Sequence, residues 1–276
     1  MMLFKHQQRK SVRLEKKTNR LQLNRFKNIL LVVGILFIAA NLRFSLTSVG
    51  PLIGMIRADI VISNGIAGLL TTFPLLSFAI FSIFAPKIVL RYDINYILMV
   101  SLIALTVGIL FRSIFHVVAL LGGTFILDSA IAMGNVLLPS LIKQKFPNKL
   151  EVMTGMYTTF MNLFGALASG LSVPISQELG LGWRKILAST ALLAFITIII
   201  WIPQLFFRNS PSTQQVTQRV NLWRSPLAWY VTLFMGIQSL LYFVMLSWLP
   251  EIFINQGMNS SKAGFMLAVV AVSLIA

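Results

Sequence analysis

The apolar residues of this chain gather into long uninterrupted blocks that short polar segments separate. Seven blocks lie at about 29–52, 64–86, 94–114, 117–142, 152–177, 186–207 and 226–252, and an eighth begins near residue 262. Most are about 20 residues long or longer, the length at which an α-helix crosses a bilayer. Continuous blocks without a two-residue alternation favour helices over a β-barrel. The pattern therefore predicts an all-α polytopic membrane protein, and Pro226 suits the first turn of the seventh span.

Composition supports the same class of protein. The chain is 57% hydrophobic and only 11% charged, whereas soluble proteins carry about 25% charged residues. It has no cysteine, which excludes disulfides, thiolate chemistry and cysteine-based metal sites. Residues 1–28 are polar and basic without an apolar stretch, so they do not form a secretory signal peptide. We expect the first span to act as a retained signal anchor.

The distribution of positive charge predicts the orientation. The net charge is +16, and 17 Lys and Arg lie on the side of the N-terminus against five, Arg112 among them, on the other. Because cytoplasmic loops carry the excess of Lys and Arg, we expect a cytoplasmic N-terminus in the cell membrane. The basic tail 1–28 is expected to set this topology and to contact anionic lipid headgroups, in preference to nucleic acid.

A faint internal repeat predicts the domain organisation. "SVGPLI…ISNGIAGLL" (48–70) reappears as "SWLPEI…NSSKAGFML" (247–267). Two parallel six-helix halves with the substrate between them at mid-membrane are one transporter architecture. We therefore expect a six-helix domain at 29–207, a polar cytoplasmic linker at 208–225, and the start of a second domain at 226–276. Four further helices should follow the eighth, so the chain is expected to be a fragment or a truncated product.

Five stretches carry a resemblance to a known family. They are "NLRFSLTSVGPLIGMIRADI", "AGLLTTFP", "GNVLLPSLIKQKFP", "MTGMYTTFMNLFGA" and "SLLYFVMLSWLPEIF". With them the chain resembles the cyanate/nitroimidazole transporter family of the major facilitator superfamily. The resemblance implies twelve helices, alternating access and small-molecule transport across the bacterial cell membrane. One departure is the superfamily's loop pattern G-x-x-x-D-R-x-G, which reads "APKIVLRYD" here and keeps Arg91 without the Asp-Arg pair.

Arg43 is a permanent charge in an apolar span, 14 residues after Ile29. It lies about 21 Å along the helix, and an arginine at a helix centre costs about 2.5–3.5 kcal/mol on insertion scales. The functional interpretation is a clamp for an anion or a carbonyl group, which uses the fork of guanidinium donors. The alternatives are a structural ion pair and a side chain that snorkels to the interface. The resemblance supports the clamp, because the family's Asn-Leu-Arg falls on Asn41 to Arg43, and it makes Asn41 a second candidate for substrate binding.

Asp128 is the one acidic residue in the interior of a predicted span, away from its ends. It lies about 16 Å into that span, near the midplane. A buried carboxyl group of this kind could carry a proton in coupled transport, or it could be a fixed ion-pair partner for Arg43. Both hypotheses stay open at this point.

Five further polar residues lie within the spans. Each of them can form a hydrogen bond between helices, or it can line one central substrate site together with Arg43. The five residues are Asn135, Tyr157, Asn162, Gln238 and Tyr242. The pattern Gly165-x-x-x-Ser169 is more typical of close helix packing.

Three classes of function follow from these features. The first is a secondary transporter of a small polar or anionic molecule, driven by an ion gradient, since no G-x-x-x-x-G-K-[ST] loop for ATP is present. No cofactor and no metal are expected. An intramembrane enzyme is not expected, because Asp128 has no second acid in the interior of the spans and His6 and His116 lie outside them. The third class is a non-transporting remnant or partial assembly, since alternating access needs both halves.

Overall fold

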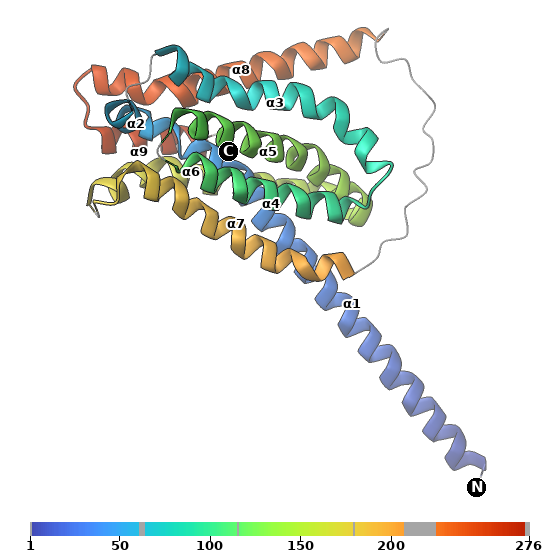
Figure 1. The fold of residues 1–276 in the computed structure, drawn as a ribbon. Helices are drawn as coiled ribbons and strands as arrows, with labels where there is room; N and C mark the ends of the chain where they lie inside the picture. The colour runs from blue at the N-terminus through green and yellow to red at the C-terminus, as the bar shows by residue number, and fades with distance from the viewer. Residues whose placement is uncertain (1, 61–63, 115, 179, 207–224, 274–276) are drawn as a thin grey trace.

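The computed structural model describes residues 2–60, 64–114, 116–178, 180–206 and 225–273, and all regular structure in these ranges is helical (Figure 1). The elements in chain order are α1 (Met2–Thr47), η1 (Gly50–Leu52), α2 (Ile53–Asp59), α3 (Asn64–Val89), α4 (Ile94–Arg112), α5 (Val117–Lys145), η2 (Pro147–Lys149), α6 (Leu150–Glu178), α7 (Gly182–Phe206), α8 (Pro226–Asn255) and α9 (Ser260–Ser273). Within the described ranges, seven helical stretches are long and apolar enough to cross a membrane. The predicted all-α polytopic architecture is confirmed.

The membrane helices after the first begin and end close to the predicted boundaries. Each described end of α3 to α8 lies within four residues of its expected position. The start of α8 follows the expected chemistry, because Pro226 lies in the first turn and the Ser225 hydroxyl accepts a hydrogen bond from the Ala228 amide at 3.4 Å. The predicted linker 208–225 lies outside the described residues except for Ser225.

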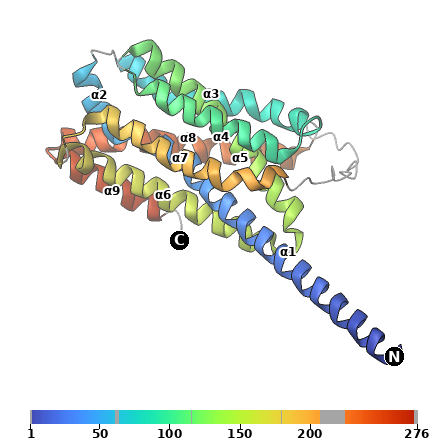
Figure 2. The same cartoon turned by 60° about the horizontal axis from the view of Figure 1, so that its bottom comes forward.

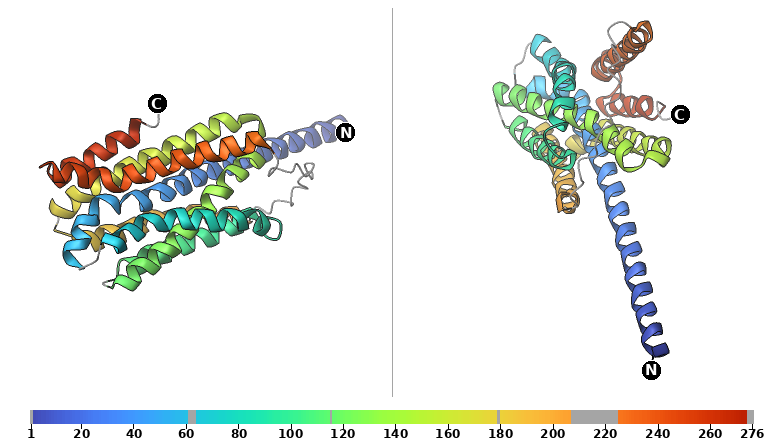
Figure 3. Two further views of the ribbon diagram at one scale, coloured as in Figure 1. Left: turned by 90° about the horizontal axis from the view of Figure 1, so that it is seen from above. Right: turned by 90° about the vertical axis from the view of Figure 1, so that its right-hand side faces the viewer.

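Helix α1 differs from its predicted bounds at both ends. The helix runs without a break from Met2, so the basic tail continues the first span as a helical arm that projects from the bundle (Figures 1 and 3). It ends at Thr47, before the expected end at residue 52. Pro51 has no backbone N–H to continue the helical hydrogen bonds, and the chain turns through η1 into the short helix α2.

Helix α1 also forms the centre of the bundle. It packs against α5, α6 and α7, while α4 packs on α5 and α7, and α3 on α5 (Figure 2). The main apolar cluster lies among these helices and includes the fully buried residues Ile35, Leu105, Leu127 and Trp201. Helix α9 lies along α6, and α8 is largely exposed, with Phe243 and Pro250 its only buried residues among the described side chains. The first six membrane helices therefore form one packed unit to which α8 and α9 attach at the side.

Glycines bring several of these helices into backbone contact. A Cβ added at Gly108 would lie 2.7 Å from the Leu127 amide nitrogen, and one at Gly123 would lie 2.7 Å from the Arg112 Cα. A Cβ added at Gly264 of α9 would lie 3.0 Å from the carbonyl oxygen of Ser169 on α6. The close packing expected at Ser169 is thus confirmed, and its neighbour turns out to be α9.

Candidate functional site

Two of the predicted site residues meet where α1 and α8 approach each other. The guanidinium carbon of Arg43 lies 4.4 Å from the centroid of the Tyr242 ring. A cation at this distance over an aromatic face is attracted by about 0.5–2 kcal/mol, more as the pair is desolvated. Because α1 belongs to the six-helix unit and α8 does not, this contact joins the two parts of the chain.

Gly165 of α6 makes room for the stem of the Arg43 side chain. A Cβ at Gly165 would lie 2.7 Å from the Arg43 Cγ. The Thr47 hydroxyl, one turn further along α1, donates to the carbonyl oxygens of Gly165 and Arg43, each at 2.9 Å. The close packing expected at Gly165 is confirmed, and it fixes the path along which the arginine leaves α1.

The guanidinium of Arg43 has donors to spare. Its Nε is buried without a hydrogen-bond partner, and Arg43 forms no ion pair with any described residue. An arginine that stacks on a ring face keeps its in-plane N–H groups free for a planar acceptor. The arrangement can therefore offer a charged, forked set of donors to an anion or a nitro or carbonyl group.

An aromatic residue follows each member of this pair in the chain, Phe44 after Arg43 and Phe243 after Tyr242. Phe44 lies edge-on to Phe164 at 6.2 Å between centroids, and Phe164 stacks on Phe160 at 6.0 Å. Tyr242 itself meets the ring of Phe243 edge-on at 5.6 Å. Phe243 is buried among residues of α1, α3 and α9, so it holds Tyr242 in place over the arginine.

Asp128 has a different electrostatic partner from the one that the sequence predicted. Its side chain is fully buried in α5, and the charge that attracts it is Arg112 of α4. An ion pair with Arg43, one of the two hypotheses for Asp128, is not observed among the described residues, and the proton-carrier hypothesis stays a prediction. No described residue donates a hydrogen bond to either Asp128 oxygen, and none accepts one from the Arg112 guanidinium. The attraction between these two side chains thus acts without a direct hydrogen bond.

The structure places Arg112 inside the bundle, although its position at the end of a predicted span had suggested a loop. Arg112 is 1% exposed, because its backbone packs directly on Gly123 of α5. Adjacent antiparallel helices bring residues on either side of their connection together, and this brings the charge of Arg112 near Asp128. The acidic residue in the span that follows Arg112, Asp128, was the sequence signal that could have indicated this partner.

Asn41 lies on another side of α1 from Arg43. Its amide nitrogen donates to the Thr197 hydroxyl of α7 at 2.7 Å and to the Phe37 carbonyl at 2.9 Å. The residue is fully buried. Its observed contacts join α1 to α7, and its predicted role in substrate binding stays a prediction.

The other four predicted site residues are not joined to this pair. Among the described residues, no hydrogen bond or ring contact links Arg43 or Tyr242 with any of Asn135, Tyr157, Asn162 and Gln238. The first three are half-buried on α5 and α6, and Gln238 is exposed on α8, one turn before Tyr242. They remain predictions about a binding site.

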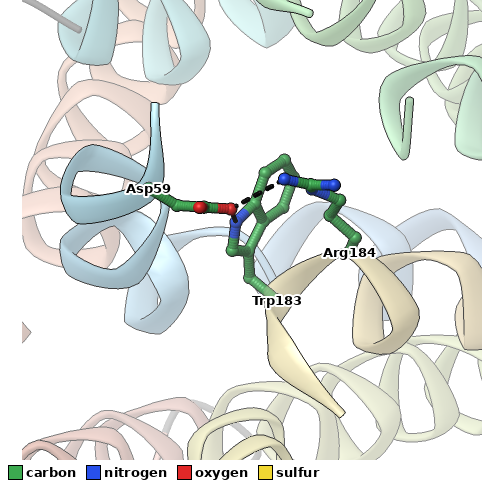
Figure 4. A network of polar contacts seen from close by, with 3 residues as sticks. All are labelled: Asp59, Trp183 and Arg184. Atoms are coloured by element: carbon green, nitrogen blue, oxygen red, sulfur yellow. Dashed lines mark hydrogen bonds and ion pairs between the residues drawn. The ribbon is translucent and has the colours of Figure 1, made fainter. Parts of the chain in front are cut away.

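A second polar group lies at the end of the bundle away from the N-terminus, where sequence reasoning found only loop charges. The Asp59 carboxylate accepts hydrogen bonds from the Trp183 indole and the Arg184 guanidinium, each at 2.9 Å (Figure 4). Nearby, Arg57 of α2 forms an ion pair of 3.1 Å with Glu251 of α8. Helix α2 is thereby bonded to both α7 and α8.

A bundle of membrane-length helices defines a polytopic helical membrane protein. The family model described as Major Facilitator Superfamily matches residues 34–276. The chain belongs to this superfamily, as the resemblance predicted.

Three curated relatives are transport proteins by name. The chain is 46% identical over 240 residues to the uncharacterized transporter YycB of Bacillus subtilis (strain 168), covering 87% of this chain and 60% of the relative. It is 39% identical to the 2-nitroimidazole transporter of Escherichia coli (strain K12), over 86% of this chain and 60% of that protein. Identity to the cyanate transport protein CynX of the same strain is 25%, over 86% and 62%.

A solved structure supports the fold. A D-xylose-proton symporter superposes with a TM-score of 0.68 at 13% identity, covering 90% of this chain and 66% of that one. The likeness at this identity concerns the fold alone. The chain spans about 60% of the length of the curated relatives that it matches.

Proposed function

We propose that this chain forms the first six-helix half and the beginning of the second half of a secondary transporter for a small polar or anionic molecule. Membership of the superfamily supports transport by alternating access between two halves. The single observation that carries the proposal is the contact of Arg43 with Tyr242, which places a charged group with free donors between the two parts of the chain.

The chemistry of this contact favours a compact, flat acceptor. A nitro group, like a carboxylate, presents two oxygens in one plane, which matches the forked donors of a guanidinium. Two relatives carry 2-nitroimidazole and cyanate in their names, and both molecules are small with exposed acceptor atoms. We propose a substrate of this class, with Arg43 as its principal contact and Tyr242 orienting the guanidinium.

The setting of the transporter belongs to the same proposal. The excess of Lys and Arg supports a bacterial plasma membrane location with a cytoplasmic N-terminus. The basic helix 2–28 is then suited to contact anionic headgroups on that side. An ion gradient drives the transport, and Asp128 beside Arg112 is the candidate for a coupled proton.

Uptake by proteoliposomes tests the role of the pair. A full-length version that supplies both halves is reconstituted and given labelled cyanate or 2-nitroimidazole, and Arg43→Lys is compared with Arg25→Lys, an exposed arginine on the same helix. Lysine keeps the charge and loses the fork, so uptake should fall about tenfold or more, equivalent to about 1.4 kcal/mol. Arg25→Lys should leave uptake unchanged.

Tyr242 variants separate the ring from the hydroxyl group. Tyr242→Phe keeps the aromatic face and should retain uptake within about twofold, whereas Tyr242→Leu removes an attraction of about 0.5–2 kcal/mol and should lower uptake about two- to thirtyfold. Uptake that is insensitive to Arg43→Lys would exclude the clamp. Absence of uptake by the unaltered full-length version, for both compounds, would contradict the proposed substrate class.

A further inference from the structure

An apolar cluster of α1, α3, α8 and α9 adjoins the contact between Arg43 and Tyr242. We propose that the ring of Phe78 in this cluster receives the flat apolar body of the substrate, while Arg43 binds its polar group. The inference rests on the proposed function and narrows the substrate to planar aromatic molecules that carry an acceptor group. It makes Phe78 a residue that determines specificity.

Both members of the arginine–tyrosine pair lead directly into the cluster. Leu46 lies three residues after Arg43, so the two side chains are neighbours on one side of α1. Phe243 follows Tyr242, and the two rings meet edge-on at 5.6 Å between centroids. Leu46, Tyr242 and Phe78 all pack around the buried Phe243. The cluster therefore begins within one helical turn of each member of the pair.

Phe78 of α3 offers the accessible ring of this cluster. Its ring centroid lies 6.2 Å from that of Phe243, with the two planes tilted by 56°. Phe243 is 8% exposed and has little free surface, whereas Phe78 is half-buried, so part of it stays accessible. Phe78 also packs against the main apolar cluster of the six-helix unit, which holds it in place. A ring that is fixed and partly accessible can pair with the ring of a bound molecule.

The guanidinium and the ring together suit a molecule with two unlike ends. The donors of Arg43 match the two oxygens of a nitro or carboxylate group. Offset or edge-on contact with Phe78 attracts an aromatic body. Cyanate is a linear anion of three atoms and can use only the first contact, whereas 2-nitroimidazole has both a nitro group and a ring. We therefore expect a lower KM for 2-nitroimidazole than for cyanate.

Uptake by the reconstituted full-length version tests the role of Phe78 through two Michaelis constants. KM is measured for labelled 2-nitroimidazole and for labelled cyanate in the unaltered protein, in Phe78→Leu and in the control Phe73→Leu. Phe73 is a half-buried residue of the same helix whose ring meets Phe125 of α5 edge-on at 5.9 Å, outside the cluster.

The two leucine variants should differ for one substrate only. Leucine keeps an apolar side chain and removes the aromatic face, so Phe78→Leu should raise KM for 2-nitroimidazole about two- to tenfold. It should leave KM for cyanate unchanged, and Phe73→Leu should change neither value. Phe78→Tyr keeps the ring and should retain both values within about twofold. A purely structural role of Phe78 in helix packing would change both substrates together, so the ratio of the two constants isolates the ring contact.

Several results would overturn the inference. One is a Phe78→Leu variant in which the ratio of the two constants is unchanged, and another is uptake of cyanate without uptake of 2-nitroimidazole. If 2-nitroimidazole alone is taken up, an equal rise of its KM in Phe73→Leu and Phe78→Leu would also contradict it. Failure of the proposed function is seen differently, as absent uptake of both compounds by the unaltered version, and the inference then falls with it.

Discussion

Helices α4 and α5 touch backbone to backbone at Gly123, and the glycine beside it offers a matched comparison. A Cβ added at Gly123 would lie 2.7 Å from the Cα and the Cβ of Arg112, whereas one at Gly122 would meet only the edge of the Phe111 ring at 3.3 Å. Carbon atoms pack at about 3.5–4.0 Å. Gly123→Ala must therefore move two backbones apart by about 1 Å, while Gly122→Ala needs a small turn of one ring.

The magnitude follows from these distances. Overpacking costs about 1–3 kcal/mol, and a backbone neighbour that cannot rotate away puts Gly123→Ala near the upper end. Alanine in place of glycine within a helix raises the free energy of unfolding by about 1 kcal/mol. We expect Gly123→Ala to lower the free energy of unfolding by about 2 kcal/mol, and Gly122→Ala to leave it unchanged or raise it by up to about 1 kcal/mol.

Thermal unfolding of the detergent-solubilised protein, followed by tryptophan fluorescence, measures the difference. A separation of about 2–3 kcal/mol between the two variants corresponds to about 5–10 °C in Tm for a chain of this size. Equal Tm values for the two alanine variants would refute the close contact of α4 with α5, and with it the buried position of Arg112.

Two further predictions concern the charged groups of the bundle. Asp128→Asn leaves the Arg112 charge buried without its partner and should lower the free energy of unfolding by about 3–5 kcal/mol. Adding Arg112→Gln should recover part of this loss in the same unfolding experiment. No recovery would show that the two side chains act separately. Gly165→Ala should push the Arg43 side chain off its path and reduce substrate uptake, whereas Gly155→Ala on the same helix, where a Cβ meets nothing within 4 Å, should leave uptake unchanged; equal effects of the two would contradict the packing of Arg43 on Gly165.

The membrane helices were predictable because their signal lies in the local sequence. A span needs about 20 consecutive apolar residues, and the blocks 94–114 and 117–142 begin where α4 and α5 begin. The start of α8 at Pro226 has a local cause as well, since proline is tolerated in the first turn of a helix. The predicted end of α1 at residue 52 was too late, although its cause is local as well, because Pro51 has no backbone N–H with which to continue the helix.

The partners of the polar residues depend on packing that no spacing rule gives. Arg112 stands at a span end, where an arginine normally reaches the interface, yet the close approach of α5 at Gly123 turns its side chain into the bundle. Depth along the helix made Arg43 a plausible partner for Asp128. Depth does not give the direction in which a side chain leaves its helix. Arg43 and Asp128 are not partners because their side chains leave their helices in different directions.

Direction around the helix also explains the stretch Asn41-Leu42-Arg43. Successive residues of an α-helix point about 100° apart, so three in a row face three sides of α1. Asn41 donates to Thr197 of α7, and Leu42 fills the space over Gly134 of α5, where a Cβ would lie 2.5 Å from a Leu42 methyl carbon.

The third side of α1 is the one that faces α6 and α8. Arg43 passes over Gly165 and reaches Tyr242 there. Because the two preceding residues fix the rotation of α1 against α7 and α5, the arginine has no other face to turn to. Asn41 and Leu42 thus anchor the helix to the first six-helix unit, and Arg43 points to the second part of the chain.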